Sequence, residues 1–272
     1  MSQQTILITG CSHGGIGYAT AKYLKDQGHR VFASARQQKD VEALITEGFE
    51  TYQIDVNNYA QVDKALQDIL TKTNGTLDIV FNNAGFGQAG AIEDVDTKYL
   101  RDEFETNFFA LHNLTSQAIK IMRKQGYGKI IQHSSVFGLV YSKYRGPYIA
   151  SKYAVEGLTD TLRLELTGTN IHISTLNTGP ITSKFRENMV KTAKNIDIQS
   201  SHHKDEYEKM LKWQHKKIPF NEPAISVAKV VEKIISSKQP KARYHITKAT
   251  WIFVILKRIL PTNLLDKVLL KL

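Results

Sequence analysis

Ser135, Tyr148 and Lys152 are the residues of this chain whose types and spacing most clearly suggest chemistry. Tyr148 and Lys152 are four positions apart, so they share one face of a helix if the stretch from Pro147 is helical. A nearby positive charge favours the phenolate over the phenol, which predicts a tyrosine that can act as a proton donor near neutral pH. Such a pair is also common on solvated helix faces, so the spacing alone does not define an active site.

A glycine-rich turn near the N-terminus favours the chemical interpretation. The apolar run TILIT is followed by GCSHGGIG and then by YATAKYLKDQGH, which predicts a strand, a turn and a helix. Glycines in such a turn allow a pyrophosphate to approach the backbone N–H groups at the start of the helix. Because a strand precedes the turn and a helix follows it, an ordinary loop is the less favoured interpretation.

From about Thr5 to Arg243 the chain resembles the short-chain dehydrogenase/reductase family. The family pattern Thr-Gly-x-x-x-Gly-x-Gly is present with one extra residue as TGCSHGGIG, and the family motif NNAG matches Asn82 to Gly85. The helix asparagine of the family matches Asn107 in FETNFFA. The resemblance implies a catalytic tetrad of Asn107, Ser135, Tyr148 and Lys152.

The roles implied by this resemblance belong to hydride transfer between a nicotinamide and a carbonyl or alcohol carbon. Tyr148 would exchange a proton with the substrate oxygen, and Ser135 would hold that oxygen where negative charge develops. Lys152 would contact the nicotinamide ribose and lower the pKa of Tyr148. Asn107 would fix a water that links Lys152 to solvent.

The end of the second expected strand, VFASARQQKD, bears on the choice of cofactor. Folds selective for NAD place an acidic residue there, whereas an arginine accommodates the 2′-phosphate of NADP. Ala35 stands at the acidic position and Arg36 follows it, so we expect NADP(H) rather than NAD(H), although Arg36 could be an ordinary surface residue. Asp55 resembles the family's adenine-contacting aspartate, but a polar cap at a strand end is the alternative. The full set of expected cofactor contacts is Gly10, Ser12, His13, Gly15, Ile16, Gly17, Arg36, Asp55, Val56, Asn83, Ala84, Gly85, Tyr148, Lys152, Pro180, Ile181 and Ser183.

Alternating strand-like and helix-like segments predict an α/β fold. We expect a single-domain Rossmann fold over residues 1–272, with a doubly wound parallel sheet of about seven strands and helices on both faces. The expected strands are TILIT, RVFASA, TYQID, LDIVFN, KIIQHSS, HISTLN and ARYHIT. The expected helices span residues 16–27, 59–71, 98–124, 148–167 and 223–237.

Composition and charge narrow the function classes. The single cysteine, Cys11, cannot form an internal disulfide, and the N-terminus shows no signal-peptide pattern, so we expect a cytoplasmic protein. The net charge of +10 arises late in the chain: 17 Lys and Arg face 18 Asp and Glu through Ser183, whereas 19 face 8 from Lys184 onward. Without a nucleic-acid-binding motif, this excess suggests an anionic substrate, an anionic membrane surface or a solvated basic face.

Two late segments are expected to decide substrate and partners. Residues 184–221 form a long connection that we expect to be a substrate lid, with apolar Phe185, Met189, Met210, Leu211, Trp213 and Phe220. Within it, His202 and His203 lack a third ligand, so we expect no metal site. The amphipathic extension at residues 250–272 is too short and charged to span a bilayer, and would either pack on its own chain or a partner subunit or lie on a membrane. We also expect a homo-oligomer.

The preferred function is therefore an NADP(H)-dependent oxidoreductase for a lipophilic carbonyl or alcohol, such as a ketosteroid or an acyl ketone phosphate. The TGCSxGGIG turn, the run from Ser183 to Phe185 and the C-terminal extension are most similar to the 17β-hydroxysteroid-dehydrogenase-like branch, which includes acyl-dihydroxyacetone-phosphate reductases. The alternatives are a broad reductase of small carbonyls and a dinucleotide-sensing module without catalysis.

Overall fold

A parallel sheet of seven strands, in the order β3-β2-β1-β4-β5-β6-β9, organises the protein. The computed structural model describes residues 3–211 and 218–271. The strands are β1 (Thr5–Ile8), β2 (Arg30–Ala35), β3 (Glu50–Gln53), β4 (Ile79–Asn82), β5 (Gly128–Ser135), β6 (Ile171–Thr178) and β9 (Arg243–Ile246). The prediction of a doubly wound sheet of seven strands is confirmed. The chain reverses its direction of winding between β1 and β4, which is where open α/β sheets bind their ligands.

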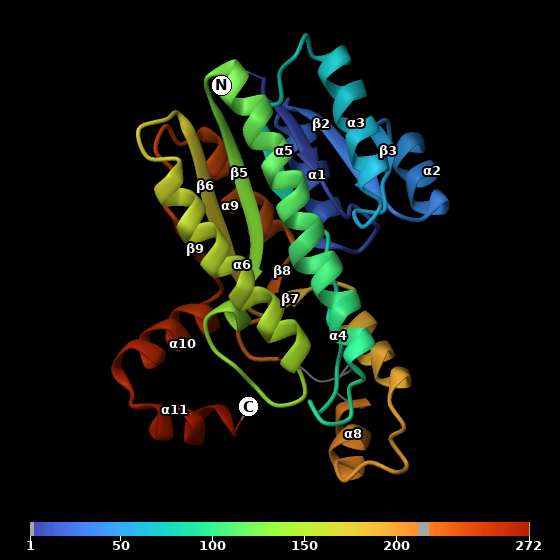
Figure 1. Ribbon diagram of the computed structural model, residues 1–272, viewed down its shortest axis with the longest axis vertical. Helices are drawn as coiled ribbons and strands as arrows, with labels where there is room; N and C mark the ends of the chain where they lie inside the picture. Colours follow the sequence, from blue (N-terminus) through green and yellow to red (C-terminus); the bar gives the residue numbers. More distant parts are fainter. Residues whose placement is uncertain (1–2, 212–217, 272) are drawn as a thin grey trace.

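Helices cover both faces of the sheet (Figure 1). One hydrophobic cluster joins the sheet to α1 (Ile16–Asp26), α2 (Gln38–Thr46) and α9 (Ile225–Ser236). The other joins it to α3 (Tyr59–Lys72), α5 (Ala110–Gln125) and α6 (Gly146–Glu165). Helix α2 was not predicted, because only Val41 and Leu44 of its nine residues are buried and they give a weak apolar period.

The helix expected over residues 98–124 is interrupted. Helix α4 (Thr97–Phe104) continues into a π-helical turn, η1 (Glu105–Phe109), and then into α5. Asn107 lies in this π turn. Single π turns inside α-helices often mark functional sites, because the extra residue shifts where the side chains point.

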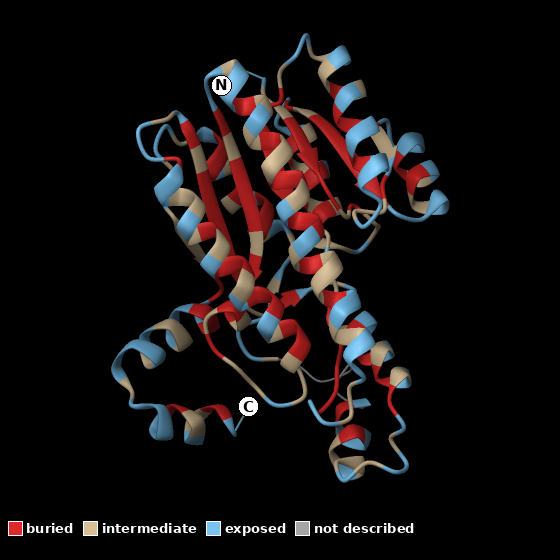
Figure 2. Cartoon of the chain, in the orientation of Figure 1, coloured by how far each residue is buried: buried red, intermediate tan, exposed pale blue. Residues whose placement is uncertain are grey.

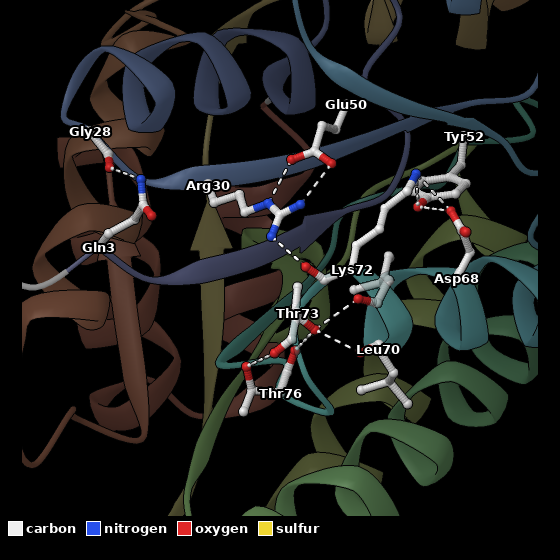
Figure 3. Close-up of polar contacts among 11 residues, drawn as sticks. Gln3, Gly28, Arg30, Glu50, Tyr52, Asp68, Leu70, Lys72, Thr73 and Thr76 are labelled. Carbon is white, nitrogen blue, oxygen red and sulfur yellow. Dashed lines mark hydrogen bonds and ion pairs between the residues drawn. The ribbon is translucent and has the colours of Figure 1, made fainter.

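Polar contacts fix the edge of the sheet formed by β3 (Figure 3). Arg30 in β2 donates to Glu50 in β3 through Nε at 2.7 Å and Nη2 at 3.1 Å, and Nη1 donates to the Lys72 carbonyl at 2.8 Å. The hydroxyl of Tyr52 donates to Asp68 in α3. A bidentate arginine–carboxylate pair has a defined geometry, so these contacts hold the ends of β2, β3 and α3 together.

The segment between β6 and α9 and the C-terminal extension gather below the carboxyl ends of the strands in Figure 1. The segment 184–221 is not a plain loop: it contains α7 (Phe185–Lys191), η3 (Thr192–Asn195) and α8 (Lys204–Leu211). It is flanked by β7 (Ile181–Thr182) and β8 (Glu222–Pro223), which pair in parallel. Met189 and Met210 are buried, whereas Leu211 and Phe220 are exposed, and Trp213 lies outside the described residues.

The C-terminal extension forms α10 (Lys248–Ile259) and α11 (Thr262–Leu269). Leu265 and Leu269 of α11 are buried against Val136 and Val140, so the part after Pro261 packs on its own chain. The first half of the extension, WIFVIL, packs through one face only, because the other face of α10 is exposed (Figure 2). No helix among residues 3–211 and 218–271 is long and apolar enough to cross a bilayer.

Candidate active site

The four predicted tetrad residues meet at the carboxyl edge of the sheet. Asn107 comes from the π turn and Ser135 from the end of β5, while Tyr148 and Lys152 lie in the first turns of α6. All four side chains are buried, with exposed fractions of 0%, 4%, 7% and 5% respectively. Pro147, at the start of α6, favours helix initiation immediately before Tyr148.

The phenol of Tyr148 lies between two aromatic rings. The ring centroid of Phe185 is 5.2 Å away and that of Phe137 is 6.4 Å away. Burial raises the pKa of Tyr148 to about 12, and hydrogen bonding to Ser135 opposes that rise. The expected lowering of this pKa is therefore wrong, although Nζ of Lys152 lies 5.7 Å from the ring centroid. Tyr148 is a protonated phenol at neutral pH and can donate a proton.

Lys152 is a buried ammonium that donates a hydrogen bond to the backbone and lies near two acidic side chains. Its Nζ donates to the carbonyl of His133 at 2.7 Å. Burial lowers the pKa of Lys152 to about 8, while the charges of Glu103 and Glu156 raise it. Glu156 also accepts a hydrogen bond from Nε of Arg243 at 3.0 Å. Lys152 is therefore linked through Glu156 to Arg243, the first residue of strand β9.

The side chain of Asn107 is fixed at both ends. Its Oδ1 accepts from the Phe86 N–H at 3.0 Å, and its Nδ2 donates to the Phe86 carbonyl at 2.9 Å. Nδ2 also lies 3.1 Å from Oε1 of Glu103 and 3.1 Å from Oγ of Ser151. The amide therefore holds the loop after β4 against α6, and its orientation is set by several partners rather than one.

The glycine-rich turn is packed so closely that two of its glycines leave no room for a side chain. A Cβ on Gly17 would lie 2.4 Å from the Gly10 carbonyl oxygen and 2.5 Å from Nδ2 of Asn83. Gly10 has a φ of +73° and its Cβ would lie 2.9 Å from Cα of Ala84. Asn83 closes this arrangement by donating to the carbonyls of Thr9 and Gly10 at 2.8 and 3.1 Å.

A cavity of about 400 Å³ opens beside this turn. Its lining includes Gly14 and Gly15 at the start of α1 and Ser183 and Lys184 after β7. The N–H groups at the N-terminus of α1 and the absence of side chains on the turn fit a pyrophosphate. The glycine-rich turn at the start of α1 therefore fits a dinucleotide.

The other predicted contacts lie along the same edge of the sheet. His13 pairs with Glu47, while the Ser12 carbonyl accepts from the Gly15 N–H at 3.1 Å. Arg36 is exposed at the end of β2. Asp55 and its neighbour Val56 follow β3, and the Asp55 carboxylate accepts from the Asn57 N–H at 3.1 Å, as the capping alternative predicts.

The residues predicted for the nicotinamide end lie after β4 and β6. Ala84 N–H donates to Thr9 Oγ1 at 3.0 Å, and a Cβ on Gly85 would lie 2.9 Å from Asn107 Oδ1. On the other side, Pro180 accepts from the Glu222 N–H at 3.1 Å, which starts the pairing of β7 with β8. That pairing includes Ile181, and Ser183 follows directly.

Sequence reasoning missed His133 and Glu103. His133 lies between strand ends, with Nδ1 2.9 Å from Asn83 Oδ1 and Nε2 3.2 Å from Thr178 Oγ1. Burial lowers the pKa of His133 to about 3, so the imidazole is neutral and links Asn83, after β4, to Thr178 at the end of β6. Glu103 stands four positions before Asn107, and this helical spacing could have identified it.

In the described part of the chain, no group of three His, Cys, Asp or Glu residues is arranged to hold a metal.

Comparisons with known proteins agree with this geometry. The family model described as short chain dehydrogenase matches residues 4–194. An uncharacterized oxidoreductase of Escherichia coli, YbbO, is 37% identical over 267 residues, which cover 98% of this chain and 94% of the relative. A 3-ketodihydrosphingosine reductase of Bacteroides thetaiotaomicron is 31% identical over 98% of this chain and 96% of its own length. An NADPH-dependent 3-dehydrocapnine reductase of Ornithobacterium rhinotracheale is 31% identical over 97% of this chain and 95% of its own length.

Solved structures show the same fold at lower identity. Serine dehydrogenase complexed with NADP+ has a TM-score of 0.77 at 22% identity, covering 91% of this chain and 96% of that structure. At this identity the similarity supports the Rossmann architecture.

The packing of the glycine-rich turn yields a stability prediction. Gly17→Ala should destabilise the protein, because the new Cβ cannot avoid the Gly10 carbonyl, and an overpacked core site costs about 1–3 kcal/mol. The matched control is Gly157→Ala in α6, where a Cβ meets nothing within 4 Å. This control should be neutral or stabilising by up to ~1 kcal/mol. Thermal unfolding of both variants checks this; equal midpoints would contradict the close packing at Gly17.

Proposed function

Because this chain belongs to the short-chain dehydrogenase family and is therefore an oxidoreductase, we propose that it transfers a hydride between NADP(H) and a lipophilic carbonyl or alcohol. The observation that carries the proposal is the position of the Tyr148 phenol, beside Lys152 and Ser135 and at the same sheet edge as the glycine-rich turn. The Tyr148 phenol can supply a proton, the Ser135 hydroxyl can donate a hydrogen bond, and the glycine-rich turn can bind a dinucleotide. Together, at one edge of the sheet, these groups suit the reduction of a carbonyl.

The chain's own residues would act on the substrate oxygen. A bound nicotinamide would supply the hydride chemistry. Tyr148, as a protonated phenol, would donate its proton to the oxygen on which negative charge develops, and Ser135 would hold that oxygen by a hydrogen bond. Lys152 would help return a proton to Tyr148. Asn107 would keep the loop after β4 in place beside them.

The preference for NADP(H) rests on the end of β2. Ala35 is buried where NAD-selective folds carry a carboxylate, and the next residue, Arg36, is exposed. Within residues 3–211 and 218–271, no carboxylate pairs with Arg36, so its guanidinium is available for a 2′-phosphate. A relative named as NADPH-dependent supports the same choice.

The substrate class is inferred from the residues of segment 184–221 that lie next to Tyr148. We propose that residues 184–221 are a substrate lid, because Phe185 contacts the Tyr148 ring and Met189, Ala193 and Tyr207 form a buried apolar cluster with the loop after β4. Burial lowers the pKa of Arg145, and the positive charge of half-buried Arg186 nearby lowers it further. Two cations beside an apolar lid suit a lipophilic carbonyl with an anionic end. Relatives named as 3-ketodihydrosphingosine and 3-dehydrocapnine reductases support a ketone substrate.

The experiment that tests the proposal is a screen of NADPH oxidation. The panel contains ketosteroids, long-chain acyl ketone phosphates and small water-soluble ketones. A preference for the long-chain or steroid ketones supports the proposal. Preference for the small ketones would indicate the broad reductase of small carbonyls, and cofactor binding without turnover of any substrate would indicate the non-catalytic sensor.

Tyr148→Phe should lower turnover of the best substrate by about two or more orders of magnitude while leaving NADPH binding near the wild-type value, because the ring is kept and only the acid is lost. Steady-state kinetics and a fluorescence titration of NADPH measure the two quantities. The control is Tyr153→Phe on the exposed side of α6, which should remain active. A Tyr148 variant with turnover within about threefold of wild type would show that Tyr148 is not the acid.

Arg36→Ala should weaken NADPH binding far more than NADH binding, because only NADPH offers the 2′-phosphate for a charge-assisted hydrogen bond. Dissociation constants of both cofactors, measured for Arg36→Ala and for the exposed control Arg101→Ala, make the comparison. An equal effect of Arg36→Ala on both cofactors would show that Arg36 does not contact that phosphate.

We further propose that the outer face of α10 contacts an anionic lipid surface, where a lipophilic substrate would be available. Four large apolar side chains on this face are 42% to 66% exposed, namely Trp251, Ile252, Ile255 and Ile259. From Thr247 to Lys271 the sequence has five Lys and Arg and one acid, Asp266, which accepts from Tyr141 at 2.6 Å. An apolar face flanked by basic residues is typical of helices that lie in a membrane interface.

Replacing Trp251, Ile255 and Ile259 together by Gln should weaken binding to phosphatidylglycerol vesicles at least about tenfold, since each lost apolar contact contributes on the order of 1 kcal/mol. Wild-type binding should also weaken with salt. The control is Leu164→Gln, an apolar residue 68% exposed on α6. Vesicle sedimentation and gel filtration measure the result. A wild-type dimer that the triple variant dissociates, without vesicle binding, would assign the face to a second copy of the chain instead.

A further inference from the structure

Glu103 in α4 is a buried carboxyl group that the proposed mechanism does not use. Its exposed fraction is 0%, and both of its oxygens accept hydrogen bonds. Oε2 accepts from the backbone N–H of Gln88 at 2.9 Å, and Oε1 accepts from Nδ2 of Asn107 at 3.1 Å. Buried carboxyl groups are costly unless their partners satisfy them, so this arrangement requires a specific explanation.

On one side, Glu103 connects to the lid through Gln88. Nε2 of Gln88 donates to the Thr192 carbonyl at 3.0 Å, and its Oε1 accepts from Nδ2 of Asn195 at 3.0 Å. Both partners belong to η3 within the lid. The N–H of the next residue, Ala89, donates to Thr192 Oγ1 at 2.9 Å. Glu103 therefore binds the same stretch of backbone, Gln88 and Ala89, that forms hydrogen bonds with the lid.

On the other side, Glu103 orients the catalytic amide. Nδ2 of Asn107 points at the carboxylate from four residues further along the same helix. Both neighbours of Glu103 are donors, and the ionised carboxylate accepts from both with a negative charge on its oxygens. A protonated carboxyl keeps acceptor capacity but carries no charge, so both hydrogen bonds weaken.

The charged and titratable groups facing Glu103 come from α6. Lys152 lowers the pKa of Glu103, and the charge of Glu103 raises the pKa of Tyr148. Gln88 and Asn107 present neutral donors that lower its pKa. Burial is the largest influence and raises the pKa of Glu103 to about 8, so its ionisation falls within the working range of an enzyme.

We propose that Glu103 is a positioning residue that couples the substrate lid to the catalytic centre. As the carboxylate it holds Asn107 and the Gln88 backbone in one arrangement and supports the ammonium of Lys152. When it gains a proton, both hydrogen bonds lose their charge assistance and Lys152 loses the neighbouring negative charge. This inference rests on the proposed oxidoreductase function.

The test compares the pH profiles of kcat for wild type, Glu103→Gln and the control Asp102→Asn, an exposed acid beside it in α4. Glu103→Gln removes the negative charge beside Lys152, so the pKa of Lys152 should fall. The alkaline limb of the profile should then move down by about one pH unit, the scale of one lost opposite charge. At pH 9, where wild-type Glu103 is mainly ionised, kcat should fall about tenfold, as for one lost hydrogen bond, while NADPH affinity stays near wild type. Asp102→Asn should match wild type. A Glu103→Gln profile that superimposes on wild type, or an equal shift in Asp102→Asn, would overturn the proposal.

A second measurement needs neither a variant nor catalytic activity. In wild-type protein, the NMR signal of the Gln88 backbone N–H should move with an apparent pKa of about 8, because its acceptor changes charge there. A Gln88 signal that stays constant through that range would contradict the proposal even if Glu103→Gln does not fold. If the wild-type enzyme reduces no carbonyl yet this signal titrates, the proposed function fails while the link through Glu103 stands.

Discussion

A positive charge buried under the carboxyl edge of the sheet, the ammonium of Lys152, is the constraint on which the site depends. An ammonium taken out of water is costly unless hydrogen bonds and opposite charges compensate it. The His133 carbonyl and the charge of Glu156 provide that compensation, and Glu103 adds to it when it is ionised. Glu156 in turn accepts from Arg243 in β9, so the last strand of the sheet helps to support the charge beside Tyr148.

The same compensation links several elements of the site to one another. The partners of Lys152 come from β5, α4 and α6, and each has further bonds of its own. Asn83 ties the glycine-rich turn to the end of β4 and, through His133, to β5. The glycine-rich turn, which would bind a dinucleotide, is thus joined by a chain of hydrogen bonds to Lys152, which would help to move a proton.

Much of this arrangement is predictable from sequence because it depends on local patterns. Apolar runs followed by glycine or asparagine motifs place β1, β4 and β5 and their terminal turns, and the spacing from Ser135 to Lys152 places one helix face. Neutral His133 depends on contacts between segments far apart in sequence, which no local pattern reports. The four-residue spacing links Glu103 to Asn107, but it does not reveal the bond from the Gln88 N–H. The same reason accounts for the wrong direction expected for the Tyr148 pKa: the spacing reveals the neighbouring Lys152, but not the depth of burial that outweighs it.

The most direct test of the account is hydride transfer itself. Wild-type enzyme is incubated with a ketone substrate and with NADPH that carries deuterium at the transferable position of the nicotinamide, and the alcohol product is analysed by mass spectrometry and NMR. The account predicts one deuterium in each product molecule, bonded to the former carbonyl carbon, while the hydroxyl proton comes from solvent through Tyr148. Consumption of NADPH without deuterium at that carbon would contradict it.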